Sequence, residues 1–198
     1  TLTVHNNDDP VLIDGLKVQG GELTVYERAL SDGSTPGTPA LTQSGTFTVT
    51  ALDGVQTLTV GGINVVTAGV TAGFPQTFTT ALGNTLTITG YDAASGVVSY
   101  SYTLNDNEAH PTANGINSLS ESFTVTVTDS NGTTASDSLD VNIVDDVPQA
   151  KDDGNAVTAT ELHTVLTGNV LDNDVQGADR VISGPVTAGT LAGAYGQL

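Results

Sequence analysis

Short runs in which apolar residues alternate with hydroxyl-bearing residues are the feature that most restricts the fold of this chain. In these runs Thr or Ser alternates with Val, Ile, Leu, Phe or Tyr, so an extended strand would place one kind of side chain on each face. Helical periodicity is nearly absent. The pattern therefore predicts an all-β protein. The runs occupy residues 46–52, 56–60, 76–80, 85–89, 97–103, 122–128 and 138–143.

Pairs of turn-forming residues separate these runs. Glycine and asparagine tolerate the positive φ angles of tight hairpin loops, which explains their place between strands. Seven or more short strands joined in this way predict a β-sandwich, and in a Greek-key sandwich the loops after alternate strands gather at the same end. The turn pairs are Asp53-Gly54, Gly61-Gly62, Gly83-Asn84, Ser95-Gly96 and Asn131-Gly132.

A short motif occurs twice and suggests tandem modules. Leu-Thr-Val at residues 2–4 precedes Asp8-Asp9-Pro10, and Leu-Asp-Val at 139–141 precedes Asp145-Asp146-Val147-Pro148. Proline cannot donate to a sheet ladder, so each copy is typical of a last strand that enters a linker. We expect the end of a preceding module and its linker at 1–10, a complete sandwich at 11–146, and a truncated repeat at 147–198 with strands near 156–161 and 181–183. The abrupt end at Leu198 suggests a piece of a longer protein.

The charge balance limits the partners. The chain of 198 residues has 22 Asp and Glu against 4 Lys and Arg, a formal net charge of −18. Such a surface repels nucleic-acid phosphates and anionic lipids, so neither nucleic acid nor membrane insertion is expected. The carboxylates either keep the protein soluble or bind hard cations such as calcium. The chain contains no cysteine, so it cannot form disulfides. Its stability must come from packing, backbone hydrogen bonds or a bound metal.

Acidic residues are predicted to gather at the C-terminal end of the complete module. Calcium takes six to eight oxygen ligands, which carboxylates and carbonyls in loops supply. Because several carboxylates should converge here, we expect a calcium-binding junction between modules. Its predicted ligands are Glu27, Asp106, Glu108, Asp145 and Asp146, with Asp153, Asp172 and Asp174 from the following repeat.

A second calcium site is predicted at the opposite end. The hairpin that contains Asp129 and Asn131 should lie near the incoming linker with Asp8 and Asp9. Asp and Asn are also common in turns because their side chains bond the local backbone. For Asp129 and Asn131 the turn interpretation and the metal interpretation stay open.

Signals for an enzyme are weak. His5, His110 and His163 are scattered, and the sequence has no thiol, serine elbow or phosphate-binding glycine loop. Paired carboxylates could hydrolyse glycosides, but the aromatic content of 5% offers few sugar platforms. The sequence therefore favours a non-catalytic protein, and each histidine is expected to be a surface or hydrogen-bonding residue.

The ordered motifs resemble the type I secretion target repeats of large bacterial RTX adhesins. The residues that carry the resemblance are Val25-Tyr26-Glu27-Arg28-Ala29-Leu30, 83–91, 100–104 with His110, 123–129 and Asp145-Asp146-Val147-Pro148. The segment 150–174 is similar to the opening of a cadherin-like or VCBS-type repeat. One departure is Asn131, where such repeats often carry a further aspartate, which implies weaker calcium binding at that hairpin.

The resemblance implies an extracellular Ig-like or cadherin-like sandwich at the bacterial surface. Its implied role is to extend and stiffen an adhesin that supports attachment and biofilm formation, as a monomer whose partners are neighbouring repeats. The alternative is a module of the same adhesin that binds a sugar or peptide, with loops 61–74 and 105–119 as candidates. Few aromatic residues lie in these loops, which favours the extender over the ligand-binding module.

Overall fold

The computed structural model describes residues 9–110, 115–154, 160, 162 and 167–179. Its elements are mostly strands: β1 (Leu12–Asp14), β2 (Leu23–Tyr26), the 3-10 turn η1 (Glu27–Ala29), β3 (Thr42–Thr50), β4 (Val55–Val60), β5 (Ile63–Thr67), β6 (Val70–Thr71), β7 (Gln76–Thr79), β8 (Thr85–Asp92), β9 (Val97–Thr103), β10 (Ser118–Asp129) and β11 (Thr134–Val144). The all-β prediction is therefore confirmed.

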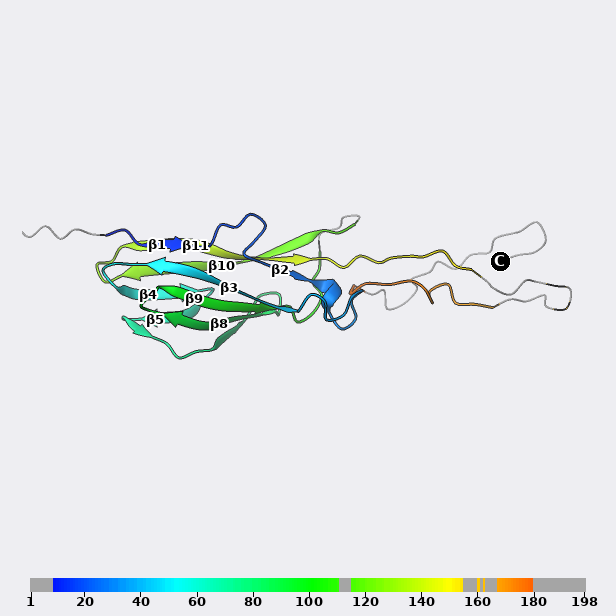
Figure 1. Cartoon of the computed structure of the whole chain (residues 1–198), viewed down its shortest axis with the longest axis horizontal. Helices are drawn as coiled ribbons and strands as arrows, with labels where there is room; N and C mark the ends of the chain where they lie inside the picture. The colour runs from blue at the N-terminus through cyan, green and yellow to red at the C-terminus, as the bar shows by residue number, and fades with distance from the viewer. Residues whose placement is uncertain (1–8, 111–114, 155–159, 161, 163–166, 180–198) are drawn as a thin grey trace, which may run out of the picture.

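Two sheets face each other and form a sandwich. One has the strand order β1-β3-β9-β8-β7, and the other has the order β2-β11-β10-β4-β5-β6. Figure 1 shows the two layers lying along the long axis of the molecule. The chain changes sheets between β1 and β2, between β2 and β3, between β3 and β4, between β6 and β7, and between β9 and β10, so each sheet is built from distant parts of the sequence.

The alternating runs form the strands that the pattern predicts. In β9 Val98, Tyr100 and Tyr102 are buried, while the Ser and Thr residues between them are partly exposed. In β10 Phe123, Val125 and Val127 point inward in the same way. Burial of these faces supplies the main driving force for folding. The short strands β1, β2, β5 and β6 fall outside the predicted runs. The strands β10 and β11 each begin four residues before the run that predicts them.

The pairing of β2 with β11 positions the candidate site. These strands run parallel, and Val144 lies opposite Tyr26. Because parallel strands end at the same edge of a sheet, the residues that follow, Glu27 and Asp145, emerge side by side. All other strand pairs of the described residues are antiparallel.

Beyond β11 the chain leaves the sandwich along its long axis (Figure 1). Residues 145–154 run beside residues 167–179, and the two segments are joined by a bridge in which Gln149 and Val175 exchange backbone hydrogen bonds of 2.7 and 2.9 Å. The strands predicted near 156–161 and 181–183 lie almost entirely outside the described residues. Within the described part of the chain, no helix is long and apolar enough to cross a membrane.

We expect Leu139→Ala to destabilise the protein by about 2–5 kcal/mol, because it leaves a cavity where a fully buried side chain packs between the sheets. The matched control is Leu52→Ala, since Leu52 is 73% exposed. Its loss should stay below about 0.5 kcal/mol. Urea unfolding measures both variants, and equal losses would show that Leu139 does not belong to the core.

Candidate metal centre

Glu27 is the centre of an acidic cluster at the end where the chain leaves the sandwich. It begins η1 directly after β2, and its side chain is fully buried. The turn is tightened by Gly33, where an added Cβ would stand 2.5 Å from the carbonyl oxygens of Glu27 and Arg28. Only glycine permits this approach, so the loop after η1 folds back over Glu27.

One oxygen of the Glu27 carboxylate is fully engaged and the other is not. Oε1 accepts hydrogen bonds from the backbone N–H of Glu108 at 2.6 Å and from Nε2 of His110 at 3.0 Å. Oε2 is buried and has no hydrogen-bond partner among the described residues. A buried carboxylate oxygen without a partner is costly, which makes it a natural ligand for a cation.

Asp145 and His110 complete a group of three possible ligands. Single ligand atoms of Glu27, His110 and Asp145 all lie within 4.8 Å of one another. Two oxygens on opposite sides of a calcium ion would stand about 4.6 to 5.2 Å apart, given bonds of about 2.3 to 2.6 Å. The spacing therefore fits ligands of one ion.

Burial sets the electrostatics of the cluster. Burial raises the pKa of Glu27, while the hydrogen bonds from Glu108 and His110 oppose that rise and the negative charge of Asp179 adds to it. Burial likewise raises the pKa of Glu108. A hydrogen bond from Asn84 lowers this pKa, whereas the negative charges of Glu121 and Asp106 raise it further. Both carboxylates thus favour either a proton or a neighbouring positive charge.

Asp146 lies in the same region but is engaged in structural hydrogen bonds. Its carboxylate accepts the backbone N–H of Ser34 at 2.7 Å, the hydroxyl of Ser34 at 2.6 Å and the N–H of Ala178 at 3.1 Å. These bonds connect the loop after η1, the linker and the segment beyond it. Asp146 therefore acts as a clamp of the junction in this structure.

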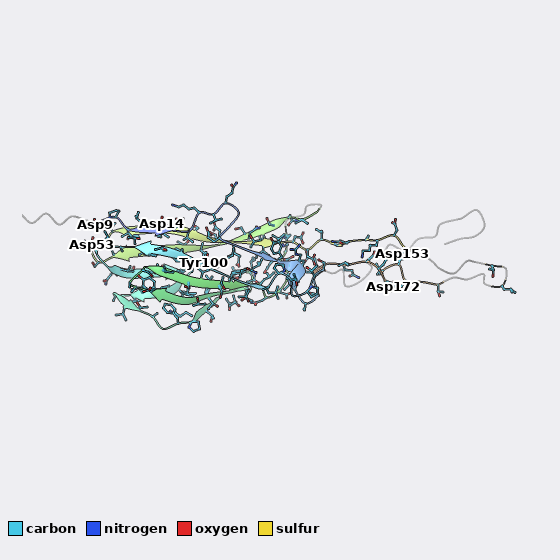
Figure 2. All side chains as sticks on the ribbon, viewed as in Figure 1. Asp9, Asp14, Asp53, Tyr100, Asp153 and Asp172 are labelled. Carbon is cyan, nitrogen blue, oxygen red and sulfur yellow. The ribbon has the colours of Figure 1, made fainter. Side chains whose placement is uncertain are left out.

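The acids of the following segment are spread along it. Asp174 lines a cavity of about 390 Å³ together with Asp32 and Ser34, and its carboxylate accepts the N–H of Lys151. Asp172 accepts a hydrogen bond from Asn169, which is three residues earlier. Figure 2 shows Asp153 and Asp172 beyond the end of the sandwich. The structure does not bring these two residues to the Glu27 cluster.

Asp106 and Glu108 come from the loop after β9. Asp106 is exposed, and its carboxylate accepts the N–H of the next residue. Glu108 is buried and is held by Asn84 at 2.6 Å. The backbone N–H of Glu108 donates to Glu27, so Glu108 lies next to the cluster, as the sequence predicts. Its own carboxylate accepts a hydrogen bond from Asn84.

At the opposite end Asp129 makes the hydrogen bonds of a turn. Its Oδ1 accepts the N–H groups of Asn131 at 2.9 Å and Thr133 at 2.8 Å, while its buried Oδ2 has no partner among the described residues. The Asn131 residue is exposed. Figure 2 shows Asp9 next to Asp53, and the N–H of Asp9 lies 3.3 Å from the Asp53 carboxylate. Asp8 lies outside the described residues.

Two residues that contact the Glu27 cluster, His110 and Asp179, are not among the ligands predicted from the sequence. His110 was expected to be a surface or hydrogen-bonding residue, and its side chain is 4% exposed and bonded to Glu27. Asp179 accepts a hydrogen bond from Asn107 at 2.6 Å and acts electrostatically on Glu27. One feature of the sequence could have indicated that His110 lies at the cluster. It stands two residues after Glu108, in the same acidic loop.

Comparisons with family models, curated proteins and solved structures found no match. The interpretation of the cluster therefore depends on its own chemistry. Two carboxylates with further acids close by suit hard oxygen-seeking ions, whereas an imidazole ligand would suit zinc or another transition metal. The Nε2 of His110 bonds Glu27 Oε1, while Glu27 Oε2 and His110 Nδ1 are both buried without a hydrogen-bond partner among the described residues. The cluster therefore offers carboxylate oxygens of Glu27 and Asp145 and one imidazole nitrogen to a cation.

In the presence of a chelator, Glu27→Gln should remove a pH-dependent loss of stability. The folded state holds the Glu27 proton more tightly than the unfolded chain, so its contribution falls as pH rises from the ordinary pKa of 4.5 through the raised value. The free energy of unfolding, measured by urea between pH 4.5 and 7.5, should favour the variant increasingly at higher pH.

The control for this experiment is Asp92→Asn. Hydrogen bonds from the Ser95 hydroxyl and the Ala94 N–H lower the pKa of Asp92 below its ordinary value of 3.8, so its contribution is lost only at more acidic pH. Between pH 4.5 and 7.5 the stability of Asp92→Asn should therefore run parallel to that of the parent protein. Parallel stability curves for the Glu27→Gln variant and the parent protein would contradict the assignment of a perturbed Glu27.

Proposed function

We propose that this chain is a structural extender module of a secreted bacterial cell-surface adhesin, stiffened by calcium at the junctions between modules. The observation that carries the proposal is the unpartnered Oε2 of the buried Glu27, at the point where the linker leaves the sandwich. No reaction is assigned to the chain.

The location of the cluster explains how a cation would stiffen the junction. Glu27 belongs to the sandwich, Asp145 belongs to the linker, and Asp179 comes from the segment beyond the linker. Without a cation these negative charges repel each other by about 1 kcal/mol for each pair 4 Å apart in water, and more at lower dielectric. A bound calcium ion would replace the repulsion with shared ligands and hold the linker in one direction.

The strand order supports an Ig-like module. In sandwiches of the immunoglobulin class, two antiparallel sheets share the strands of a Greek key. Here β3, β9 and β8 are the central strands of one sheet, and β4, β10 and β11 belong to the other. The N-terminal strands are split, because β1 joins the first sheet and β2 joins the second. This arrangement agrees with the resemblance to type I secretion target repeats and with a complete module at 11–146.

The proposed setting is the bacterial surface. The absence of cysteine suits a protein that depends on packing and metal in place of disulfides, and calcium is plentiful outside cells. The proposed partners are the neighbouring repeats of the same chain. The module would act as a monomer that projects binding domains from the cell and so supports attachment and biofilm formation.

Calcium should raise the unfolding temperature and make the protein narrower in small-angle scattering. At a calcium concentration 100-fold above the dissociation constant the gain is about 2.7 kcal/mol. Dissociation constants of about 0.1 to 1 mM are ordinary for extracellular modules. Both effects are measured in 10 mM calcium, where these constants give a gain of about 1.4 to 2.7 kcal/mol, and then with a chelator.

Matched variants identify the site in the same experiment. Glu27→Gln and Asp145→Asn should each remove most of the calcium-dependent rise, because each deletes a ligand charge. Asp92→Asn, at the last residue of β8, should keep the full rise. A parent protein that responds to calcium in neither stability nor shape would overturn the proposal.

A further inference from the structure

The strand β10 is twice as long as its neighbour β4. β10 has 12 residues and β4 has 6 residues. The pairing with β11 covers β10 from Ser118 to Thr128, but the pairing with β4 covers only Val125 to Asp129. One side of the first half of β10 is therefore an open strand edge within the larger sheet (Figure 1).

The hydrogen-bond pattern shows which backbone groups face this open edge. The carbonyl of Thr124 accepts the N–H of Gly61, so Thr124 points toward β4. The register with β11 is regular, and alternate residues of a strand point to the same side. Ser120 and Ser122 therefore direct their N–H and C=O groups to the open edge, where no described residue pairs with them.

The turn after β4 leaves this edge open. Gly61 and Gly62 have φ angles of 55° and 92° and turn the chain back into β5. A Cβ on Gly61 would stand 3.1 Å from the ring of Phe123, so the turn is packed closely against β10. Glycine at this position ends β4 level with Thr124 and holds the chain away from Ser120 and Ser122.

A groove of about 640 Å³ lies beside the open edge. Phe78 and Leu82, each 37% exposed, form part of its apolar wall. Glu121 is the charged residue of its lining, and it points inward from β10. Its carboxylate accepts the hydroxyl of Tyr102 at 2.6 Å and the N–H of Leu82 at 3.4 Å.

We propose that this groove binds an extended peptide segment as an added strand beside β10, with a Lys or Arg side chain opposite Glu121 and apolar side chains over Phe78 and Leu82. Strand addition uses the unpaired backbone groups for affinity and alternate side-chain pockets for specificity. A cross-strand pair of opposite charges adds to both. This binding site is independent of the proposed calcium junction at Glu27.

Charge selects a basic peptide over a second copy of this chain. Two molecules that each carry a net charge of −18 repel, and edge pairing would place a like-charged carboxylate near Glu121. Inward-pointing charges on open edges are a known means of preventing self-association. The same carboxylate therefore excludes self-pairing and accepts a positively charged partner.

The test uses the acetylated and amidated peptide Ser-Val-Thr-Lys-Thr-Val-Ser and a control peptide with Glu in place of Lys. Amide NMR spectra of the full chain are recorded during titration up to 5 mM peptide. We expect shifts and slower hydrogen exchange at the amides of Ser120 and Ser122 with the lysine peptide, and weaker binding of the glutamate peptide.

Two substitutions at Ser120 separate the backbone from the side chain. Ser120→Pro removes the outward N–H and should weaken binding about 2- to 10-fold, as expected for one lost hydrogen bond. Ser120→Ala keeps the N–H and should bind like the parent protein. Glu121→Gln should reduce the preference for the lysine peptide by about two- to fivefold.

Several results would overturn the proposal. They are the absence of shifts at 5 mM peptide, shifts that map outside the groove, and equal binding of the lysine and glutamate peptides by the parent protein. Concentration-dependent dimers in sedimentation that Ser120→Pro abolishes would show instead that a second copy occupies the edge. If Ser120→Pro does not fold, the peptide comparison with Glu121→Gln and the exchange rates still decide.

Discussion

The parallel pairing of β2 with β11 is the constraint on which the functional end of this protein depends. It places Glu27 and Asp145 side by side where both strands end, although they are far apart in the sequence. The loop after β9 then covers Glu27 and supplies the Glu108 N–H and the His110 ring to one of its oxygens. The sandwich thus buries a carboxylate at its exit and leaves the second oxygen without a partner.

Asp146 and Asp145 have different roles although they are neighbours. Asp146 is 5% exposed, and its carboxylate accepts hydrogen bonds from Ser34 and Ala178. It therefore joins the sandwich to the segment that follows. Asp145 stays partly exposed next to Glu27. Since adjacent residues of an extended chain point in opposite directions, one aspartate can clamp the junction while the other faces the proposed ion.

The sequence predicted the strands well because alternation is a local signal. Runs such as 97–103 and 122–128 need only the two-residue period, and both lie in strands. The strands β1, β2 and β6 have only two to four residues, which is too few to show that period. The strand β5 has two adjacent valines, Val65 and Val66, and so does not alternate. The gathering of Glu27, Glu108 and Asp145 could be predicted from the Greek-key rule. The contacts of His110 and Asp179 with this cluster could not be predicted from the sequence. They depend on the conformation of the loop after β9 and on the path of the chain after the linker.

A crystal structure of this protein with 10 mM calcium tests the central claim most directly. The account predicts anomalous density for one calcium ion at about 2.3 to 2.6 Å from Glu27 Oε2 and from the Asp145 carboxylate. His110 should remain bonded to the other Glu27 oxygen. An ordered junction in which Glu27 Oε2 faces only water or protein atoms, with calcium absent from this cluster, would contradict the account.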